Sequence, residues 1–364
     1  MKKNLRNLKI ALVHDWLTTP GGAERVLLSL HELFPNAPIY TTIFNQKNFP
    51  QFNKAKIYTS YLNYFPGAKN HHQILIPLMP RAIESFDLKN YDLIISDSHA
   101  VAKGAIKNKN ATHICYCHTP LRYVWYPEID PRANSSFLRR AVASCLKKWD
   151  LASTSRVNYF IANSNHTKQR IFNIYHQDAK VIYPPIDIAK WQPQSGRSNY
   201  FLYVGRLVSY KKPELVVLAF NKLGLLLKVI GEGPELKKLK LLAKPNIEFL
   251  GKVNDMILKK IYAKCTALIF PTIEDFGIVP LEVMASGRPV IAYRKGGATE
   301  TIIPGVTGEF FEKQTTFELM QAVKNFHPDK YDRQIIRKQA EKFDQGIFKK
   351  KILSYIKSEL KIDN

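Results

Sequence analysis

Short, nearly continuous apolar segments alternate with helix-like segments along almost the whole chain. In the first half these segments include KIALVHD, YDLIISDS, THICYCH and YFIANS, and in the second half YFLYVGR, LLKVIGEG, IEFLG, ALIFPT and PVIAY. Strands that are apolar on both sides are typical of parallel sheets whose two faces are covered by helices. The alternation therefore predicts an α/β fold built from doubly wound, Rossmann-like parallel sheets.

The alternation breaks once, in the segment YPPIDIAKWQPQSGRSN, which holds three prolines and a Ser-Gly pair. A chain of 364 residues is too long for one ordinary core. We predict an N-terminal domain over residues 1–185 and a C-terminal domain over residues 186–345, with a cleft between the carboxyl ends of their strands. The basic amphipathic segment 346–364 is expected to be a helix that caps either domain, with the N-terminal one favoured.

The chain has a formal net charge of +24, and the excess of basic residues is shared by both halves. Nucleic acid, an anionic membrane surface or a phosphorylated small molecule could each use this charge, and a generally lysine-rich composition explains it as well. A nucleic-acid-binding protein should show a known module or a basic stripe with stacking aromatic residues, and neither is visible. We therefore expect no nucleic-acid partner.

The sequence shows no targeting or membrane-spanning signal. The basic first residues resemble the start of a signal peptide, but His14 and Asp15 interrupt the apolar run, which indicates a first strand instead. There is no run of eighteen apolar residues, and the four cysteines have no zinc-ligand spacing. These features predict a cytoplasmic protein with reduced thiols.

Two acidic residues stand out in the segment PTIEDFGIVPLEVMASG. Glu274 is expected in the loop after a buried strand, and Glu282 in the helix that begins near Gly277. The backbone N–H groups of Phe276, Gly277 and Ile278 would then be free to bind an oxyanion or a hydroxyl. A carboxylate beside them suits sugar hydroxyls, because it can accept two hydrogen bonds. Both acids could instead be ordinary helix charges, but the apolar neighbours of Glu282 argue against a solvated face.

Arg206 and Lys211 follow the strand YFLYV in the same half, where a guanidinium fork and an ammonium could hold a diphosphate. In the first half, Gly21 and Gly22 would let the backbone approach a phosphate at a helix start. His118 stands just past a strand end, where a catalytic residue would face the cleft. Each of these residues alone also has an explanation without a functional role. Arg206 and Lys211 could be solvated cations, Gly21 and Gly22 an ordinary glycine turn, and His118 a structural hydrogen-bonding residue.

The sequence predicts no metal site. There is no Asp-x-Asp triplet, the ten histidines form no His-Glu-x-x-His motif, and the glycine pattern of nicotinamide sites is absent. Phosphate charge would then be neutralised by Arg206, Lys211 and helix starts.

Together these motifs resemble the retaining family 4 glycosyltransferases of GT-B architecture. The two glutamates, with seven residues between them, and the segments VGRLVSYKK, GEGPELKKL, IEFLGKV and GRPVIAYRKGGATETI match that family in order and spacing. The segments VHDWL, GGAERV, CHTPLRYVW and FIANSNHTKQRI are similar to bacterial members that build O-antigen and exopolysaccharide, often from GDP-mannose. The resemblance extends over residues 10–345.

The resemblance implies two Rossmann-like domains facing a cleft and a reaction that moves a hexose with retention of configuration. The expected donor is GDP-mannose, and the expected acceptor is a saccharide or a polyprenyl-diphosphate-linked saccharide. No other cofactor and no metal are implied. The implied route is front-face, in which the leaving phosphate takes the acceptor proton.

The resemblance also implies roles for individual residues. Arg206 and Lys211 would hold the donor diphosphate, and Lys212 is a second candidate because it stands where many members have glycine. Glu274 would bind hydroxyls of the transferred sugar and Glu282 the ribose. The other implied contacts are the Gly21–Gly22 loop near the phosphates and acceptor, His118 at the donor sugar, and the amides of Phe276, Gly277 and Ile278.

The segment SSFLRRAVASCLKKWD has the period of an amphipathic helix. Its predicted cationic side carries Arg139, Arg140, Lys147 and Lys148, and its predicted apolar side carries Phe137, Leu138, Ala141, Val142, Cys145 and Trp149. Such a helix could contact anionic lipid, at about 1 kcal/mol per cation, and hold the protein at the inner face of the cell membrane. The alternative is a helix packed on its own domain with solvated cations.

Two other function classes stay open. A nucleotide-sugar isomerase or phosphorylase could use the same fold, although no pyridoxal-phosphate lysine is evident. Epimerised product or released nucleotide from the nucleotide-sugar alone would indicate that class. A basic nucleic-acid-binding protein would instead retain nucleic acid in a filter-binding assay at physiological salt.

Overall fold

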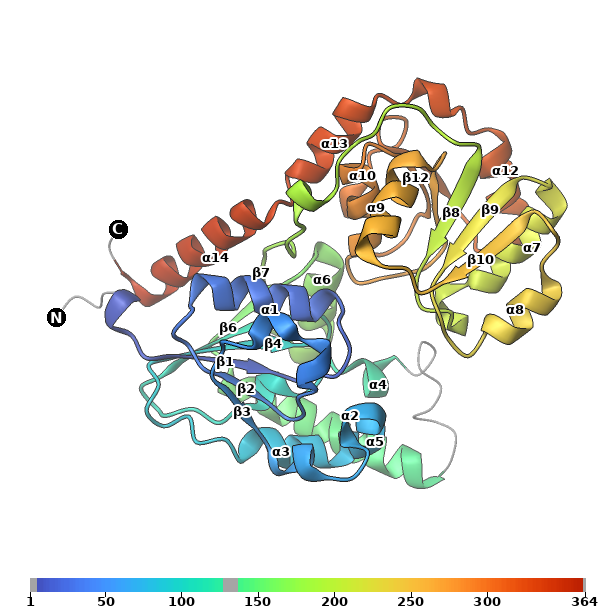
Figure 1. Cartoon of the computed structure of the whole chain (residues 1–364). Coiled ribbons are helices and arrows are strands. Elements are labelled where there is room, and N and C mark those ends of the chain that lie inside the picture. Colours follow the sequence, from blue (N-terminus) through green and yellow to red (C-terminus); the bar gives the residue numbers. More distant parts are fainter. Residues whose placement is uncertain (1–4, 127–136, 363–364) are drawn as a thin grey trace. The chain divides into compact units, whose positions relative to one another are not determined.

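The computed structural model describes residues 5–126 and 137–362, which fold into two compact units (Figure 1). Unit 1 comprises Met1–Pro185 and Gly346–Asn364, and unit 2 comprises Ile186–Gln345. Each unit contains one sheet in which all neighbouring strands are parallel. The predicted fold class of two doubly wound α/β domains is thus confirmed.

Unit 1 has a seven-stranded sheet in the order β3-β2-β1-β4-β5-β6-β7. Its strands are β1 Ile10–His14, β2 Ile39–Thr41, β3 Ile57–Thr59, β4 Leu93–Ser98, β5 Thr112–Cys117, β6 Tyr159–Ala162 and β7 Ala179–Val181. Its helices are α1 Gly22–Leu33, α2 Ala68–His71, α3 Met79–Glu84, α4 Arg122–Trp125, α5 Phe137–Ala152, α6 Asn165–Tyr175 and α14 Gln345–Leu360.

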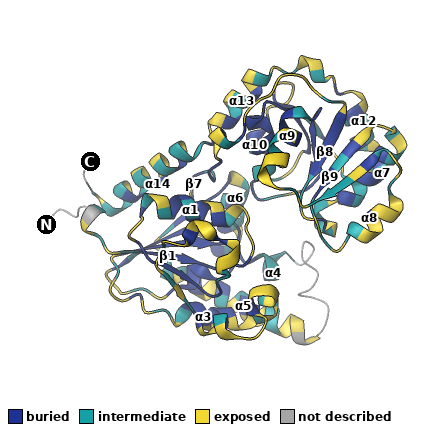
Figure 2. Ribbon diagram, in the orientation of Figure 1, coloured by how far each residue is buried: buried dark blue, intermediate teal, exposed yellow. Residues whose placement is uncertain are grey.

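Both faces of this sheet are buried, which explains the continuous apolar strands. Successive strand residues point to opposite faces. In β1, Ala11 and Val13 belong to one apolar cluster, whereas Leu12 belongs to another. In Figure 2 the strands are accordingly buried, and the exposed residues lie mainly on helices and loops.

The C-terminal helix α14 belongs to unit 1, the packing that the sequence analysis favoured. Phe348, Ile352 and Ile356 are buried in the same cluster as Leu12 and residues of α1. Lys349 on α14 also pairs with Glu32 on α1 at 2.7 Å. The chain therefore returns from unit 2 to complete the core of unit 1.

Unit 2 has a six-stranded sheet in the order β10-β9-β8-β11-β12-β13. Its strands are β8 Tyr200–Val204, β9 Leu226–Ile230, β10 Ile247–Gly251, β11 Leu268–Phe270, β12 Val290–Tyr293 and β13 Gly308–Phe311. Its helices are α7 Pro213–Leu223, α8 Leu236–Leu242, α9 Asp255–Lys264, α10 Ile278–Ala285, α11 Ala298–Thr301, α12 Thr316–Lys324 and α13 Arg333–Glu341.

The two ends of unit 2 are joined to each other. The Ile186 N–H donates to the Phe343 carbonyl at 3.0 Å, and the Gln345 N–H donates to the Ile186 carbonyl at 3.0 Å. Entry to and exit from unit 2 therefore lie side by side. No helix within the described ranges has the length and apolar character that crossing a bilayer demands.

Candidate functional site

In each sheet the chain changes direction between two central strands. In unit 2 it runs from β8 outward to β9 and β10 and then returns to place β11 on the other side of β8. In unit 1 the same reversal separates β1 from β4. Ligands of open α/β sheets bind beyond the carboxyl ends of strands at such a switch point. The site residues predicted from the sequence follow these strands or their neighbours.

Lys211 and Glu274 meet at the switch point of unit 2. Lys211 follows β8, Glu274 follows β11, and the Lys211 Nζ lies 2.7 Å from the Glu274 Oε1. The two side chains are 23% and 24% exposed. From β8, the Tyr203 hydroxyl donates to the Lys211 carbonyl at 3.2 Å, which holds the loop. The pair thus presents to solvent an ammonium that suits a phosphate and a carboxylate that suits hydroxyls.

The neighbouring Lys212 has a backbone conformation that favours glycine. Its φ of 54° and ψ of 37° lie in the left-handed region, directly before α7 begins at Pro213. A residue with a Cβ pays about 1 kcal/mol or more there, which accounts for a glycine preference at this position. The contact with Glu274 is made by Lys211, not by Lys212.

Arg206 lies on the same loop and is exposed. Within the described parts of the chain, its side chain makes no hydrogen bond or ion pair with another residue. The loop beneath it is supported by Gly231, which follows β9 with a φ of 137°. A Cβ on Gly231 would lie 2.0 Å from the Gly205 carbonyl oxygen, so only glycine allows the two loops to touch.

The loop that follows β12 fixes the backbone of Glu274. The Gly297 N–H donates to the Glu274 carbonyl at 2.9 Å. A Cβ on Gly296, whose φ is 70°, would lie 2.5 Å from that same carbonyl oxygen. These glycines follow β12, so loops after four adjacent strands, β9, β8, β11 and β12, build the site. The sequence analysis quoted them only as part of the family resemblance and assigned them no role.

Glu282 is buried rather than solvated. It lies in α10, is 2% exposed, and its Oε2 accepts a hydrogen bond from the Tyr262 hydroxyl at 3.1 Å. Gly277, with a φ of 87°, stands at the N-cap of α10 and provides no side-chain cap. Phe276, Gly277 and Ile278 thus lie at the start of α10, whose N-cap residue makes no side-chain cap hydrogen bond.

In unit 1, the loop after β1 leads into α1. Gly21 is the N-cap of this helix, offers no side-chain cap, and is exposed together with Gly22. Glu24 in the first turn is buried, and its Oε1 lies 3.8 Å from the His14 Nε2. The helix start thus offers uncapped amides beside a buried acid.

His118 is part of a buried hydrogen-bonded group. Its Nε2 lies 2.6 Å from the Asp97 Oδ1, and the His14 Nδ1 lies 2.9 Å from the Asp97 Oδ2. Burial alone would lower the pKa of His14, but Asp97 and Glu24 together raise it to about 10. Burial would raise the pKa of Asp97, but His118 and His14 hold it below its usual value. Asp97 therefore orients His118 as a carboxylate.

A second buried acid shapes the same edge. Asp15 accepts backbone hydrogen bonds from four consecutive residues after β4, which are His99, Ala100, Val101 and Ala102, at 2.5–3.0 Å. Despite its burial, the pKa of Asp15 is lowered, chiefly by the charge and hydrogen bond of His99. Sequence reasoning missed the roles of Asp15 and Asp97, whose one signal was an acid within or directly after an apolar strand.

The packed face of the basic helix α5 overlaps only in part with the predicted apolar side. Its contacts with unit 1 come from Val142, Ala143, Leu146 and Trp149. Val142 and Trp149 belong to the predicted apolar side, whereas three other members of that side, Phe137, Ala141 and Cys145, are exposed. The side chain of Leu138 lies outside the described residues. Val142, Ala143 and Leu146 line one groove together with residues of α4 and of the 72–78 segment.

Two family models match adjoining parts of this chain. The model "Glycosyltransferase Family 4" matches residues 20–190, and the model "Glycosyl transferases group 1" matches residues 186–343. Together they extend across unit 2 and most of unit 1.

Individual relatives include mannosyltransferases. The alpha-1,3/1,6-mannosyltransferase ALG2 of Dictyostelium discoideum is 24% identical, over 85% of this chain and 87% of that protein. The O-antigen chain mannosyltransferase RfbU of Salmonella typhimurium is 28% identical, over 47% of this chain and 49% of that protein. An uncharacterized glycosyltransferase of Methanocaldococcus jannaschii is 30% identical, and its match spans half of its own length.

Solved structures agree on the fold. A HepE structure from Anabaena, determined with UDP and glucose, has a TM-score of 0.71 at 19% identity and covers 97% of this chain and 100% of its own. Sucrose-phosphate synthase from Thermosynechococcus elongatus has a TM-score of 0.73 at 17% identity and covers 96% and 98%. Both support the two-unit GT-B architecture.

Proposed function

We propose that this chain is a glycosyltransferase of the kind that these two family models describe, and that it moves mannose from GDP-mannose to a saccharide or polyprenyl-diphosphate-linked saccharide with retention of configuration. The observation that carries the proposal is the Lys211–Glu274 pair at the switch point of unit 2. The choice of mannose is supported by the mannosyltransferases ALG2 and RfbU among its relatives.

In this proposal, Lys211 and Arg206 bind the donor diphosphate. Negative charge grows on the diphosphate as the sugar leaves, so fixed cations stabilise the transition state more than the bound donor. Arg206 is exposed, and its side chain makes no hydrogen bond or ion pair with another described residue, so its guanidinium can turn toward a ligand. When the donor binds, Lys211 would give up part of its ion pair with Glu274 and contact the donor phosphate instead.

The carboxylate of Glu274 would then bind hydroxyls of the transferred sugar. Glu282 would receive the ribose, beside Tyr262, which already holds one of its oxygens. The backbone amides of Phe276, Gly277 and Ile278 would contact the donor. A front-face route is proposed, in which the leaving phosphate accepts the proton of the attacking hydroxyl.

The groups of unit 1 have proposed roles toward both the donor and the acceptor. His118, held by Asp97 at 2.6 Å, would donate to the donor sugar, and Asp97 would be a positioning residue. The exposed Gly21–Gly22 helix start would approach the phosphates and the acceptor.

Glu274→Ala and Arg206→Ala test these roles. We expect each to lower kcat by about a hundredfold or more, because each removes a group proposed to act in the transition state. The melting temperature should stay nearly unchanged, because a partly exposed ion pair contributes about 1 kcal/mol or less. Glu248→Ala is a matched control, since Glu248 forms a comparable pair with Lys228 at 3.2 Å on β10. Near-normal turnover in Glu274→Ala or Arg206→Ala would refute the site.

The donor is tested by thermal shift with GDP-mannose, UDP-glucose and ADP-glucose. A donor present at a hundred times its Kd stabilises the folded protein by about 2.7 kcal/mol. For a unit of this size, that corresponds to a rise of roughly 5–10 °C in the melting temperature. Equal shifts with all three, or a shift only with UDP-glucose, would contradict the choice of GDP-mannose.

We also propose that α5 contacts anionic lipid at the inner face of the membrane. Arg139 on α5 and Ile74 on the 72–78 segment line one apolar groove of about 460 Å³. Ile74 is 76% exposed and Phe137 is 80% exposed, which is unusual for large apolar side chains. Exposed apolar groups beside cations fit a membrane interface.

Co-sedimentation with vesicles that contain phosphatidylserine tests this contact. We expect binding at low salt that is at least tenfold weaker in Arg140→Glu/Lys148→Glu, on the basis of about 1 kcal/mol per cation. Lys238→Glu in unit 2 is the control. Absence of binding by the unaltered protein would count against the proposal.

A further inference from the structure

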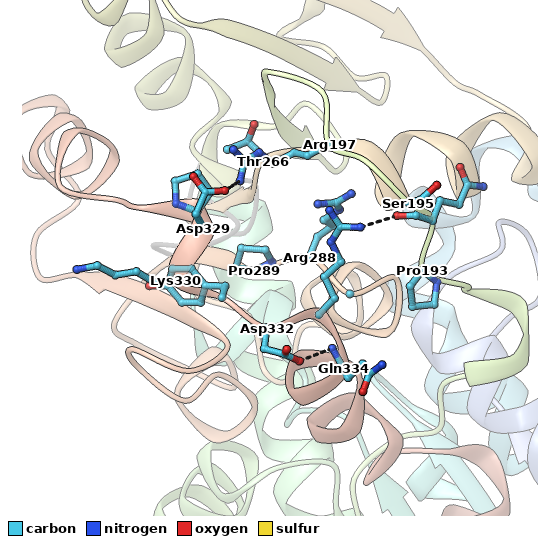
Figure 3. A pocket seen from close by; sticks show the side chains of 15 residues that line it. Pro193, Ser195, Arg197, Thr266, Arg288, Pro289, Asp329, Lys330, Asp332 and Gln334 are labelled. Carbon is cyan, nitrogen blue, oxygen red and sulfur yellow. Dashed lines mark hydrogen bonds and ion pairs between the residues drawn. The ribbon is translucent and has the colours of Figure 1, made fainter.

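Unit 2 contains a second polar pocket, at the opposite edge of its sheet from Lys211 and Glu274. The pocket has a volume of about 740 Å³ and is lined by residues that precede strands, among them Arg197 before β8, Thr266 before β11 and Arg288 before β12 (Figure 3). The strands are parallel, so residues before them lie at the amino edge, whereas Lys211 and Glu274 follow the carboxyl edge. The pocket is therefore separate from the proposed donor site.

Arg288 is the central feature of this pocket. The residue is 3% exposed, its Nε donates to the Ala263 carbonyl at 2.7 Å, and its Nη2 donates to the Gly196 carbonyl. Nη1 makes no hydrogen bond to any residue in the described ranges, and no described carboxylate pairs with the group. Burial, followed by the nearby charge of Arg333, lowers the pKa of Arg288. A buried cation without a counter-ion is unfavourable, and an anion would relieve it.

Three further cations line the same pocket. The Arg197 Nη1 pairs with Asp329 at 2.9 Å, but the Asp329 side chain is 88% exposed, so this contact is weak. The Arg333 Nη1 donates to the Gln194 carbonyl at 3.0 Å, and Lys330 is also part of the lining.

The acids of the pocket do not balance these cations. Four cations, Arg197, Arg288, Lys330 and Arg333, face two acids, Asp329 and Asp332. Asp332 is engaged as the N-cap of α13, where its Oδ1 accepts from the amides of Gln334 and Ile335 at 2.8 and 2.9 Å. The lining therefore has a surplus of positive charge, increased by the helix start itself.

We propose that this pocket binds a small phosphate-bearing anion with at least two negative charges. Several guanidinium groups that reach one space from different segments suit the planar, bidentate recognition of phosphate oxygens. The volume exceeds that of inorganic phosphate and suits a diphosphate or a phosphate ester. The ligand would bridge the segments 193–197 and 329–334. It is a second ligand, independent of the nucleotide-sugar.

The test uses calorimetry with inorganic phosphate, inorganic pyrophosphate and glycerol 3-phosphate as probes, which separates free phosphates from a phosphate ester. The host is Arg206→Gln/Lys211→Met, which lacks the cations of the proposed donor site. We expect pyrophosphate to bind this host and to bind at least about tenfold more weakly after Arg333→Gln is added, because one charge-assisted contact is worth about 1.5 kcal/mol or more.

Two further variants complete the design. Arg197→Gln should weaken binding in the same way, and Lys238→Gln, which removes one exposed charge on α8, should change it by less than about twofold. Arg288 itself is left unaltered, because its bonds to Ala263 and Gly196 hold the fold. Absence of pyrophosphate binding by the host, or less than tenfold weakening in Arg333→Gln, would overturn the proposal. Neither outcome depends on transferase activity.

Discussion

The charge on buried His14 gives a quantitative prediction. Its pKa is raised from 6.5 to about 10, so the folded state keeps a proton that the unfolded chain releases above pH 6.5. The stability from this group is fully present below pH 6.5 and is lost as pH rises toward 10. One proton contributes at most about 1.36 kcal/mol per pH unit, so unit 1 should lose roughly 2.5 kcal/mol between pH 7 and pH 9.

Asp97→Asn removes the carboxylate that stabilises this charge. Without it, Glu24 alone opposes the effect of burial, so the pKa of His14 should fall and the loss of stability between pH 7 and pH 9 should become smaller. At pH 7 the variant should be less stable by about 3–5 kcal/mol, the usual cost of breaking a buried ion pair. At pH 9 the difference from the unaltered protein should shrink by up to roughly 2.5 kcal/mol.

Unfolding in urea measures this difference. Protease cleavage within β1 and β4, detected through the peptides released, reports the unfolding of unit 1 alone. The difference is the useful quantity, because buried thiols such as Cys117, whose pKa is raised, also reduce stability above pH 8.5 in both proteins. Ser96→Ala is the control. It removes the Ser96 contact to His113, whose pKa is lowered to about 3 and which is therefore neutral throughout this range. Parallel profiles of the unaltered protein and Asp97→Asn would refute a charged His14.

Three other predictions concern single features of the structure. Lys212→Gly should raise the free energy of unfolding of unit 2 by up to about 1 kcal/mol, because it relieves the left-handed backbone, and a lower denaturation midpoint would contradict this. Phe348→Ala should destabilise unit 1 by about 3–5 kcal/mol and leave the unfolding of unit 2 unchanged, as measured by unit-specific proteolysis. Transfer activity should survive dialysis against EDTA, since the proposed phosphate contacts are Arg206 and Lys211; full loss that Mg²⁺ restores would contradict them.

Much of the fold could be predicted because the apolar strands are buried on both faces. Each of the nine strand segments read from the sequence contains a strand of the structure. Four strands of three or four residues, β2, β3, β7 and β13, were missed, whereas β11, which is as short, was recognised by its place in the apolar segment ALIFPT. Their positions depend on pairing with distant strands, which local sequence does not encode.

The part of the candidate site that lies directly after strands could be predicted, because the strand order of the sheet determines which of these loops are neighbours. Lys211 and Glu274 follow strands that became neighbours at the switch point, so their pairing follows from topology. The Asp97 group was not predictable in this way, because its contacts join side chains 83 and 21 residues apart in the chain. The packed face of α5 was predicted only in part, because apolar periodicity does not reveal which side meets a neighbour.

The adjacent ends of unit 2 have a consequence for synthesis on the ribosome. All seven strands of unit 1 emerge first, yet Phe348, Ile352 and Ile356 of its core emerge last. Unit 2 closes on itself through Ile186 and Gln345 and is fully translated earlier. The half of the protein that is made first therefore becomes complete only after the half that is made second, and until then the nascent chain exposes an apolar surface that chaperones can recognise.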